Sequence, residues 1–167
     1  ENKSRWNALL NRTRADSVTP SKIITEPLVT TIWNQYAPYD YICPTNGSYI
    51  NRGITGCVPT AFSQILKWHE WPPKGEGTAT HKDADGEVTG SLQADYSFPY
   101  EWDLMRDNHI DNWRYSSKLK DYYYPRDTID RSDWALARMM MEMGVYSEAD
   151  YEQNGTGAYS YKFKSLL

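Results

Sequence analysis

The chain has few cysteines and histidines, no long apolar run and no excess of basic residues. Its 167 residues include 2 Cys and 3 His, so one disulfide at most can form and few groups can serve as a general base. No stretch approaches the roughly 18 apolar residues of a membrane-spanning helix. Lys and Arg number 18 against 22 Asp and Glu, a net charge of −4 that argues against nucleic acid as a partner.

Aromatic residues, in contrast, are abundant, with 14 Tyr and 7 Trp. A run such as residues 122–124 (YYY) could stack on sugars. Tyr and Trp also bury large areas while finding partners for their polar tips, which favours packing as the main role. A carbohydrate-binding module is the alternative that this composition leaves open.

The thiol of Cys57 stands at a predicted helix start. Gly56 precedes it, and residues 58–71 show an apolar face at helical spacing, with Pro59 in the first turn and Pro72 after the end. Unpaired N–H groups and the helix dipole favour an anion at such a position, so thiols there are often activated nucleophiles. A small buried apolar residue is the alternative reading of a free Cys.

The motifs around this thiol occur in the order and spacing of a known family. They are residues 30–35 (TTIWNQ), 38–39 (PY), 55–61 (TGCVPTA), 64–69 (QILKWH), 100–105 (YEWDLM) and the loop 150–160. Together they resemble the streptopain family of bacterial cysteine proteases, over roughly residues 28–167. The helix departs from the family at Pro59 and at Phe62-Ser63, and neither position touches the thiol or its N–H.

The resemblance implies a papain-like α+β fold, in which Cys57 attacks peptide carbonyls and its own N–H helps to hold the oxyanion. It also implies that Thr156, Gly157 and Ala158 line the pocket for the apolar side chain that precedes the cleaved residue. A Gly-rich linker between helices would have the same composition. No metal or other cofactor is required by this chemistry.

The general base is the part that the sequence does not supply. The family's Gly-His-Ala and Asn-Trp-Gly-Trp-Gly segments do not occur here. His69 follows Cys57 by 12 residues on the same helix, about 18 Å away, whereas a base must come within about 3 Å. His81 and His109 lie in polar, loop-like stretches. We therefore expect mainly the helical half of the fold, the β half being largely missing, with the base on a C-terminal portion of the same peptidase.

The first 25 residues differ in character from the rest, since they are mostly polar. The resemblance suggests that 1–25 is a linker or propeptide remnant with an activation site near Ile23-Ile24; an ordinary disordered terminus is equally compatible. Residues 26–167 are then the N-terminal part of the peptidase domain. The chain begins at Glu1 without a signal-like segment, so we expect a signal already removed and a secreted or cell-surface bacterial protein.

Three further elements are predicted from local patterns. Cys43 is expected to be free and buried, because a disulfide to Cys57 would consume the nucleophile. Residues 78–91 predict a hairpin around Asp85-Gly86, a turn rather than a calcium loop. A buried helix is expected from Asp133 to Met143, capped by Ser132, ended by Gly144 and packed on the Cys57 helix.

The sequence thus predicts a cysteine endopeptidase acting on peptides or proteins, a chain that by itself is inactive for lack of the catalytic His. The alternative is a papain-like domain that keeps the fold but binds protein or carbohydrate without cleaving it.

Overall fold

The computed structural model describes residues 27–45, 52–82, 91–109, 112–118 and 120–165. Within these residues the α-helices are α2 (Cys57–His69) and α3 (Arg131–Tyr146), and the strands are β1 (Thr78–Lys82), β2 (Ser91–Asp95), β3 (Arg114–Ser116) and β4 (Asp121–Tyr123). Short 3-10 helices lie at Trp102–Leu104, Arg126–Thr128 and Ser160–Ser165. The α+β class is confirmed, with helix dominant and two small antiparallel sheets.

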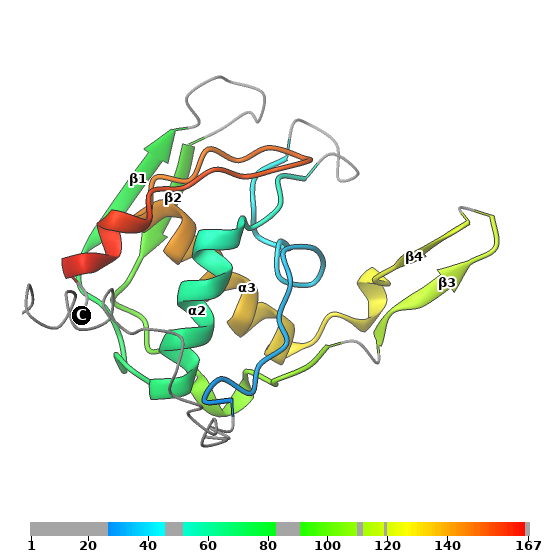
Figure 1. The fold of residues 1–167 in the computed structure, drawn as a ribbon, viewed down its shortest axis with the longest axis horizontal. Helices are drawn as coiled ribbons and strands as arrows, with labels where there is room; N and C mark the ends of the chain where they lie inside the picture. Colours follow the sequence, from blue (N-terminus) through cyan, green and yellow to red (C-terminus); the bar gives the residue numbers. More distant parts are fainter. Residues whose placement is uncertain (1–26, 46–51, 83–90, 110–111, 119, 166–167) are drawn as a thin grey trace, which may run out of the picture.

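Figure 1 shows α2 lying beside α3, the predicted packing, with the β1–β2 hairpin on one side and the β3–β4 hairpin extending away from the body. In the first hairpin Thr78 pairs with Asp95 and Lys82 with Ser91. The predicted hairpin is therefore present. Its Asp85-Gly86 turn, the rejected calcium loop and segment 1–25 all lie outside the described residues. No described helix is long and apolar enough to cross a membrane.

Helix α2 begins one residue earlier and ends two residues earlier than the sequence predicts. Cys57 itself is the first helical residue, and Gly56 precedes it with φ +86°. Glu70, with φ +48°, ends the helix in the left-handed conformation, and its N–H donates to the carbonyls of Leu66 and Lys67. The chain thus leaves the helix before Pro72 makes this necessary.

Helix α3 is longer than predicted at both ends, and both predicted boundary residues are wrong. Asp130, not Ser132, is the N-cap: the Asp133 N–H donates to its carboxylate at 3.0 Å, and the Asp130 N–H returns a bond to Asp133 at 3.2 Å. This capping box provides hydrogen-bond acceptors for two backbone N–H groups that have none within the helix. Gly144 is not a terminator but an interior residue, where a Cβ would lie 1.8 Å from the Tyr151 hydroxyl oxygen.

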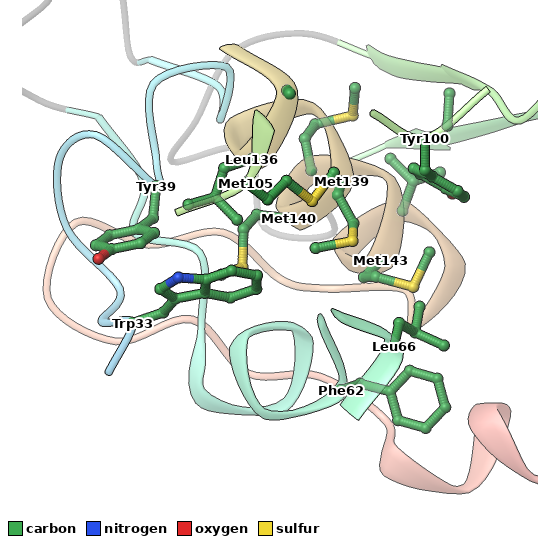
Figure 2. Close-up of a cluster of buried hydrophobic side chains, with 14 of the residues drawn as sticks. Trp33, Tyr39, Phe62, Leu66, Tyr100, Met105, Leu136, Met139, Met140 and Met143 are labelled. Atoms are coloured by element: carbon green, nitrogen blue, oxygen red, sulfur yellow. The ribbon is translucent and has the colours of Figure 1, made fainter. Parts of the chain in front are cut away.

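The core forms where α3 meets α2 and the segment before it. Figure 2 shows methionines of α3 in this cluster, as expected of a buried helix. Its labelled members are Trp33, Tyr39, Phe62, Leu66, Tyr100, Met105, Leu136, Met139, Met140 and Met143. Many aromatic rings are therefore packing residues, as expected, while Trp68, Trp71, Tyr115 and Tyr123 remain exposed.

Candidate active site

The thiol of Cys57 is free and exposed at the first position of α2. The backbone that leads to it is held from both sides: Gly53 N–H donates to Pro44 O at 2.9 Å, and Thr55 N–H donates to Gln35 O at 3.1 Å. On the opposite side, Ile54 N–H donates to Glu152 O at 3.1 Å. These bonds fix where the helix starts, and so where the thiol lies.

Cys43 differs from Cys57 in every respect that governs reactivity. It is free, as predicted, but only 2% of it is exposed. Burial raises the pKa of the Cys43 thiol far above its usual value, so it stays protonated. Arg52 stabilises this region by donating from one nitrogen to the carbonyl oxygens of Asp40, Tyr41 and Cys43. Cys57 is therefore the cysteine available for chemistry.

An apolar groove of about 330 Å³ opens beside Cys57. It runs along α2 and the last 3-10 turn, and its lining residues are Cys57, Val58, Ala61, Phe62, Ile65, Ser160, Phe163 and Lys164. Phe62 and Phe163 stack with ring centroids 3.7 Å apart, which joins the last turn to the helix. The thiol thus borders a surface suited to apolar groups.

None of the three histidines lines this groove. His69 is the last residue of α2, and His81 lies in β1. His109, expected in a polar loop, is instead buried, with Nδ1 2.5 Å from a carboxylate oxygen of Asp133. Although burial opposes ionisation, hydrogen bonds from His109, the Asp130 N–H and Tyr124 hold the pKa of Asp133 below its usual range.

The three residues that the sequence predicts as pocket lining lie in different surroundings. Thr156 is buried against Gly56, directly before the nucleophile. Gly157 is exposed and pairs with Asp150, while Ala158 is half-buried against the small cluster that contains Cys43. Only Thr156 is thus brought next to Cys57; from the same loop end, Ser160 lines the groove.

Gln35 is a site candidate that the sequence reasoning missed. Its carbonyl oxygen accepts the Thr55 N–H, so the backbone of this half-buried residue is held close to the segment that leads into α2. Residues 33–35 (WNQ) were part of the motif set, but nothing in the sequence alone placed them beside residue 55.

A second pocket of about 370 Å³, with a mixed polar and apolar lining, lies where the segment 36–41 meets Arg52, Ile54 and the loop after α3. Asp40 is 9% exposed, and burial raises its pKa to about 7 even though the Arg52 guanidinium opposes the shift. The residues that line this pocket come from positions 36 to 154 of the chain, so no local sequence pattern could have predicted the pocket.

A free thiol at a helix start, facing an apolar groove in an α+β domain, is the arrangement of a cysteine-dependent hydrolase. The model of the peptidase C10 family matches residues 33–167, and the chain belongs to that family. The resemblance to streptopain-type cysteine proteases is thereby confirmed.

The solved relatives include active interpain A from Prevotella intermedia, 31% identical with a TM-score of 0.64 over 83% of this chain and 51% of that one. A prointerpain A fragment from the same organism is 30% identical, with a TM-score of 0.65 over 96% and 48%. Streptopain of Streptococcus pyogenes is 24% identical over 143 residues, which are 81% of this chain and 33% of streptopain. The chain thus spans about half of the interpain chains and a third of streptopain.

Proposed function

We propose that this chain carries the nucleophile of a cysteine endopeptidase, with Cys57 attacking the carbonyl carbon of a peptide bond. The observation that carries the proposal is the exposed free thiol at the first residue of α2, in a C10 family chain whose other cysteine is buried. Cleaved substrates are peptides or proteins with an apolar side chain near the scissile bond, because the groove beside the thiol is apolar.

The reaction is acyl transfer. A general base removes the thiol proton, the thiolate attacks, and the former base protonates the departing amine; water then hydrolyses the thioester. The negative oxygen of the intermediate needs donors. The Cys57 N–H is one, since N–H groups in the first turn have no acceptor within the helix, and the Gln35 side-chain amide is the second.

The base comes from a C-terminal portion of the same peptidase. Two observations support this: no histidine lines the groove, and this chain covers only 51% and 48% of the two interpain chains. A third is the exposed stripe formed by Cys57, Ala61, Ile65 and Trp68, spaced four, four and three residues apart along one side of α2. We propose that the C-terminal portion covers this stripe and that the chain alone is inactive.

The remaining assignments follow the same proposal. Residues 1–25 are a propeptide remnant, in keeping with the existence of a prointerpain among the relatives, and 26–167 are the N-terminal part of the peptidase domain. The loop that carries Thr156, Gly157 and Ala158 contributes to the wall that receives the substrate side chain once the C-terminal portion is present. In the part of the chain that the structure describes, none of the three lines the groove beside Cys57, and Thr156 supports the loop from inside. The protein acts outside a bacterial cell.

The test is intact-mass labelling of the chain, alone and with the C-terminal portion, by iodoacetamide and by a peptidyl electrophile with an apolar residue two places before the cut. We expect the peptidyl probe to modify Cys57 only when both portions are present, and Cys57→Ala to abolish labelling. Cys43→Ala is the matched control and should label normally. A Cys57 that never reacts faster than Cys43 would overturn the proposal in favour of a binding domain.

A further inference from the structure

The hydroxyl group of Thr156 is buried against the segment that leads into α2. Its O–H donates to the carbonyl oxygen of Ile54 at 2.6 Å, and its oxygen accepts the Glu152 N–H at 3.2 Å. Thr156 is only 7% exposed and is absent from the lining of the groove beside Cys57. Its polar group therefore works inside the protein, on the backbone three residues before the thiol.

The methyl group of Thr156 packs on the residue directly before the thiol. Gly56 has φ +86°, a conformation that L side chains rarely adopt, and a Cβ there would lie 2.9 Å from the Thr156 methyl carbon. The methyl thus occupies space that Gly56 leaves empty. Gly56 is also where the backbone turns into α2, because its carbonyl accepts the N–H and the hydroxyl of Thr60 at 3.2 and 2.8 Å.

The loop that carries Thr156 is itself anchored. Asp150 and Gly157 exchange hydrogen bonds of 2.8 and 3.2 Å, which closes the loop. Tyr151, with 0% exposed, inserts its ring against Gly144 of α3. Figure 1 shows this returning segment, in orange, passing close to the start of α2. A movement of Thr156 would require α3 packing to change, so the loop is a firm support.

We propose that Thr156 is a positioning residue for Cys57, a role that rests on the proposed function and deepens it. The hydroxyl holds the Ile54 carbonyl and thereby sets the direction of the Cys57 thiol and N–H, while the methyl group, which fills the space beside Gly56, plays the smaller part. The Cys57 thiol must attack the carbon, and the Cys57 N–H must donate to the oxygen, of the same substrate carbonyl. A displacement of about 1 Å in such a site can cost about 100-fold in rate.

The test compares Thr156→Val with Thr156→Ser in the full peptidase that contains this segment. Valine keeps the shape of threonine and removes the donor, whereas serine keeps the donor and removes the methyl. We expect Val to lower kcat about tenfold or more with KM within about twofold, because the loss affects the reacting geometry and not substrate binding. Ser should retain kcat within about threefold.

Two controls keep the outcomes distinct. Alkylation of buried Cys43, which requires opening of the fold, should stay slow in both variants and shows that they are folded. The positioning role alone would be overturned if Cys57→Ala loses turnover while Thr156→Val keeps full kcat. It would also be overturned if the Val and Ser variants lose kcat equally, or if Cys43 of the Val variant is alkylated rapidly. Turnover that survives in Cys57→Ala would overturn the proposed function and the positioning role together.

Discussion

At the scale of single residues, the site depends on how differently the protein treats groups of the same type. Cys57 is exposed at a helix start, while Cys43 is buried and its pKa is raised. Asp133 is fully bonded at a helix cap, whereas Asp40 faces a pocket with its pKa raised to about 7. Residue type therefore says little about role until the partners are known.

Gln35→Ala is predicted to lower kcat by about 10- to 100-fold with little change in KM. Under the proposed function the Gln35 amide donates to the oxyanion of the intermediate, so its removal affects the transition state more than the bound substrate. Steady-state kinetics of the full peptidase measure this. The matched control is Asn34→Ala, since the Asn34 side chain accepts the Tyr36 N–H and stabilises a turn instead. Equal kinetics for the two variants would remove Gln35 from the oxyanion hole.

Asp40→Asn is predicted to change how stability depends on pH. The folded-state pKa of Asp40, about 7, lies above its value of 3.8 in the unfolded chain, so the folded state retains the proton longer. This contribution to stability is fully present below pH 3.8 and is lost as pH rises through 7. Asparagine does not ionise, so the free energy of unfolding of the variant should not fall in this way. Relative to the parent, the variant should become more stable by about 1–3 kcal/mol as the pH rises from 5 to 8.

Urea unfolding of the parent and of Asp40→Asn at both pH values measures this gain. Asp103→Asn, which removes an exposed carboxyl, is the control and should change little. If the free energies of unfolding of the parent and of Asp40→Asn change equally with pH, then ionisation of Asp40 does not destabilise the folded protein, and the prediction is wrong.

At the scale of elements, the support of the nucleophile is a chain of contacts between α3, the loop 150–157 and the start of α2. Tyr151 joins the first two and Thr156 the last two. The contact at Gly144 allows the backbone of α3 to approach the Tyr151 ring closely. Helix α3 thus tolerates a residue of poor helix propensity because packing compensates for it.

Gly144→Ala is predicted to destabilise the fold by about 2–4 kcal/mol, because the new Cβ would overlap the Tyr151 hydroxyl at the core. Thermal or urea unfolding measures it. Gly155→Ala is the matched control: no atom lies within 4 Å of its Cβ position, so its stability should change by less than about 0.5 kcal/mol. A Gly144→Ala variant as stable as the control would mean that Tyr151 moves aside freely.

At the scale of the whole molecule, one face of the domain is left apolar and open. The stripe on α2 begins at the nucleophile and continues to Trp68, which is 46% exposed. Neighbouring rows of the same helix are buried in the core against α3. A helix that is apolar on two sides has a second face available for packing besides the one that α3 covers.

Ile65→Asp is predicted to reduce the assembly of the chain with the C-terminal portion by tenfold or more. A carboxylate buried against an apolar partner is costly, while the isolated chain should keep its stability because Ile65 is 38% exposed. The readout is recovery of peptidyl-probe labelling on mixing the two portions. Phe98→Asp, at an exposed site off the stripe, should assemble normally. Equal recovery for both variants would place the partner elsewhere.

The sequence by itself determined the parts that depend on local order and spacing. Helix α2, its position relative to Cys57 and the family follow from contiguous motifs, helical periodicity and Gly or Pro boundaries. The free state of Cys43 follows from the need to keep Cys57 unbridged. The limits of α3 did not, because Asp130 and Ser132 are both good capping residues and only the fold selects between them.

Only the tertiary structure decided which distant residues support the site. Thr156 is 102 positions from Ile54, and Gln35 is 20 positions from Thr55. In the same way, the buried His109 pairs with Asp133, which belongs to α3. Such contacts leave no period in the sequence, since each is made by a single residue whose partner is set by how α3 and its loops pack. For the same reason Gly144, which looked like a helix end, proved to be a point of close approach.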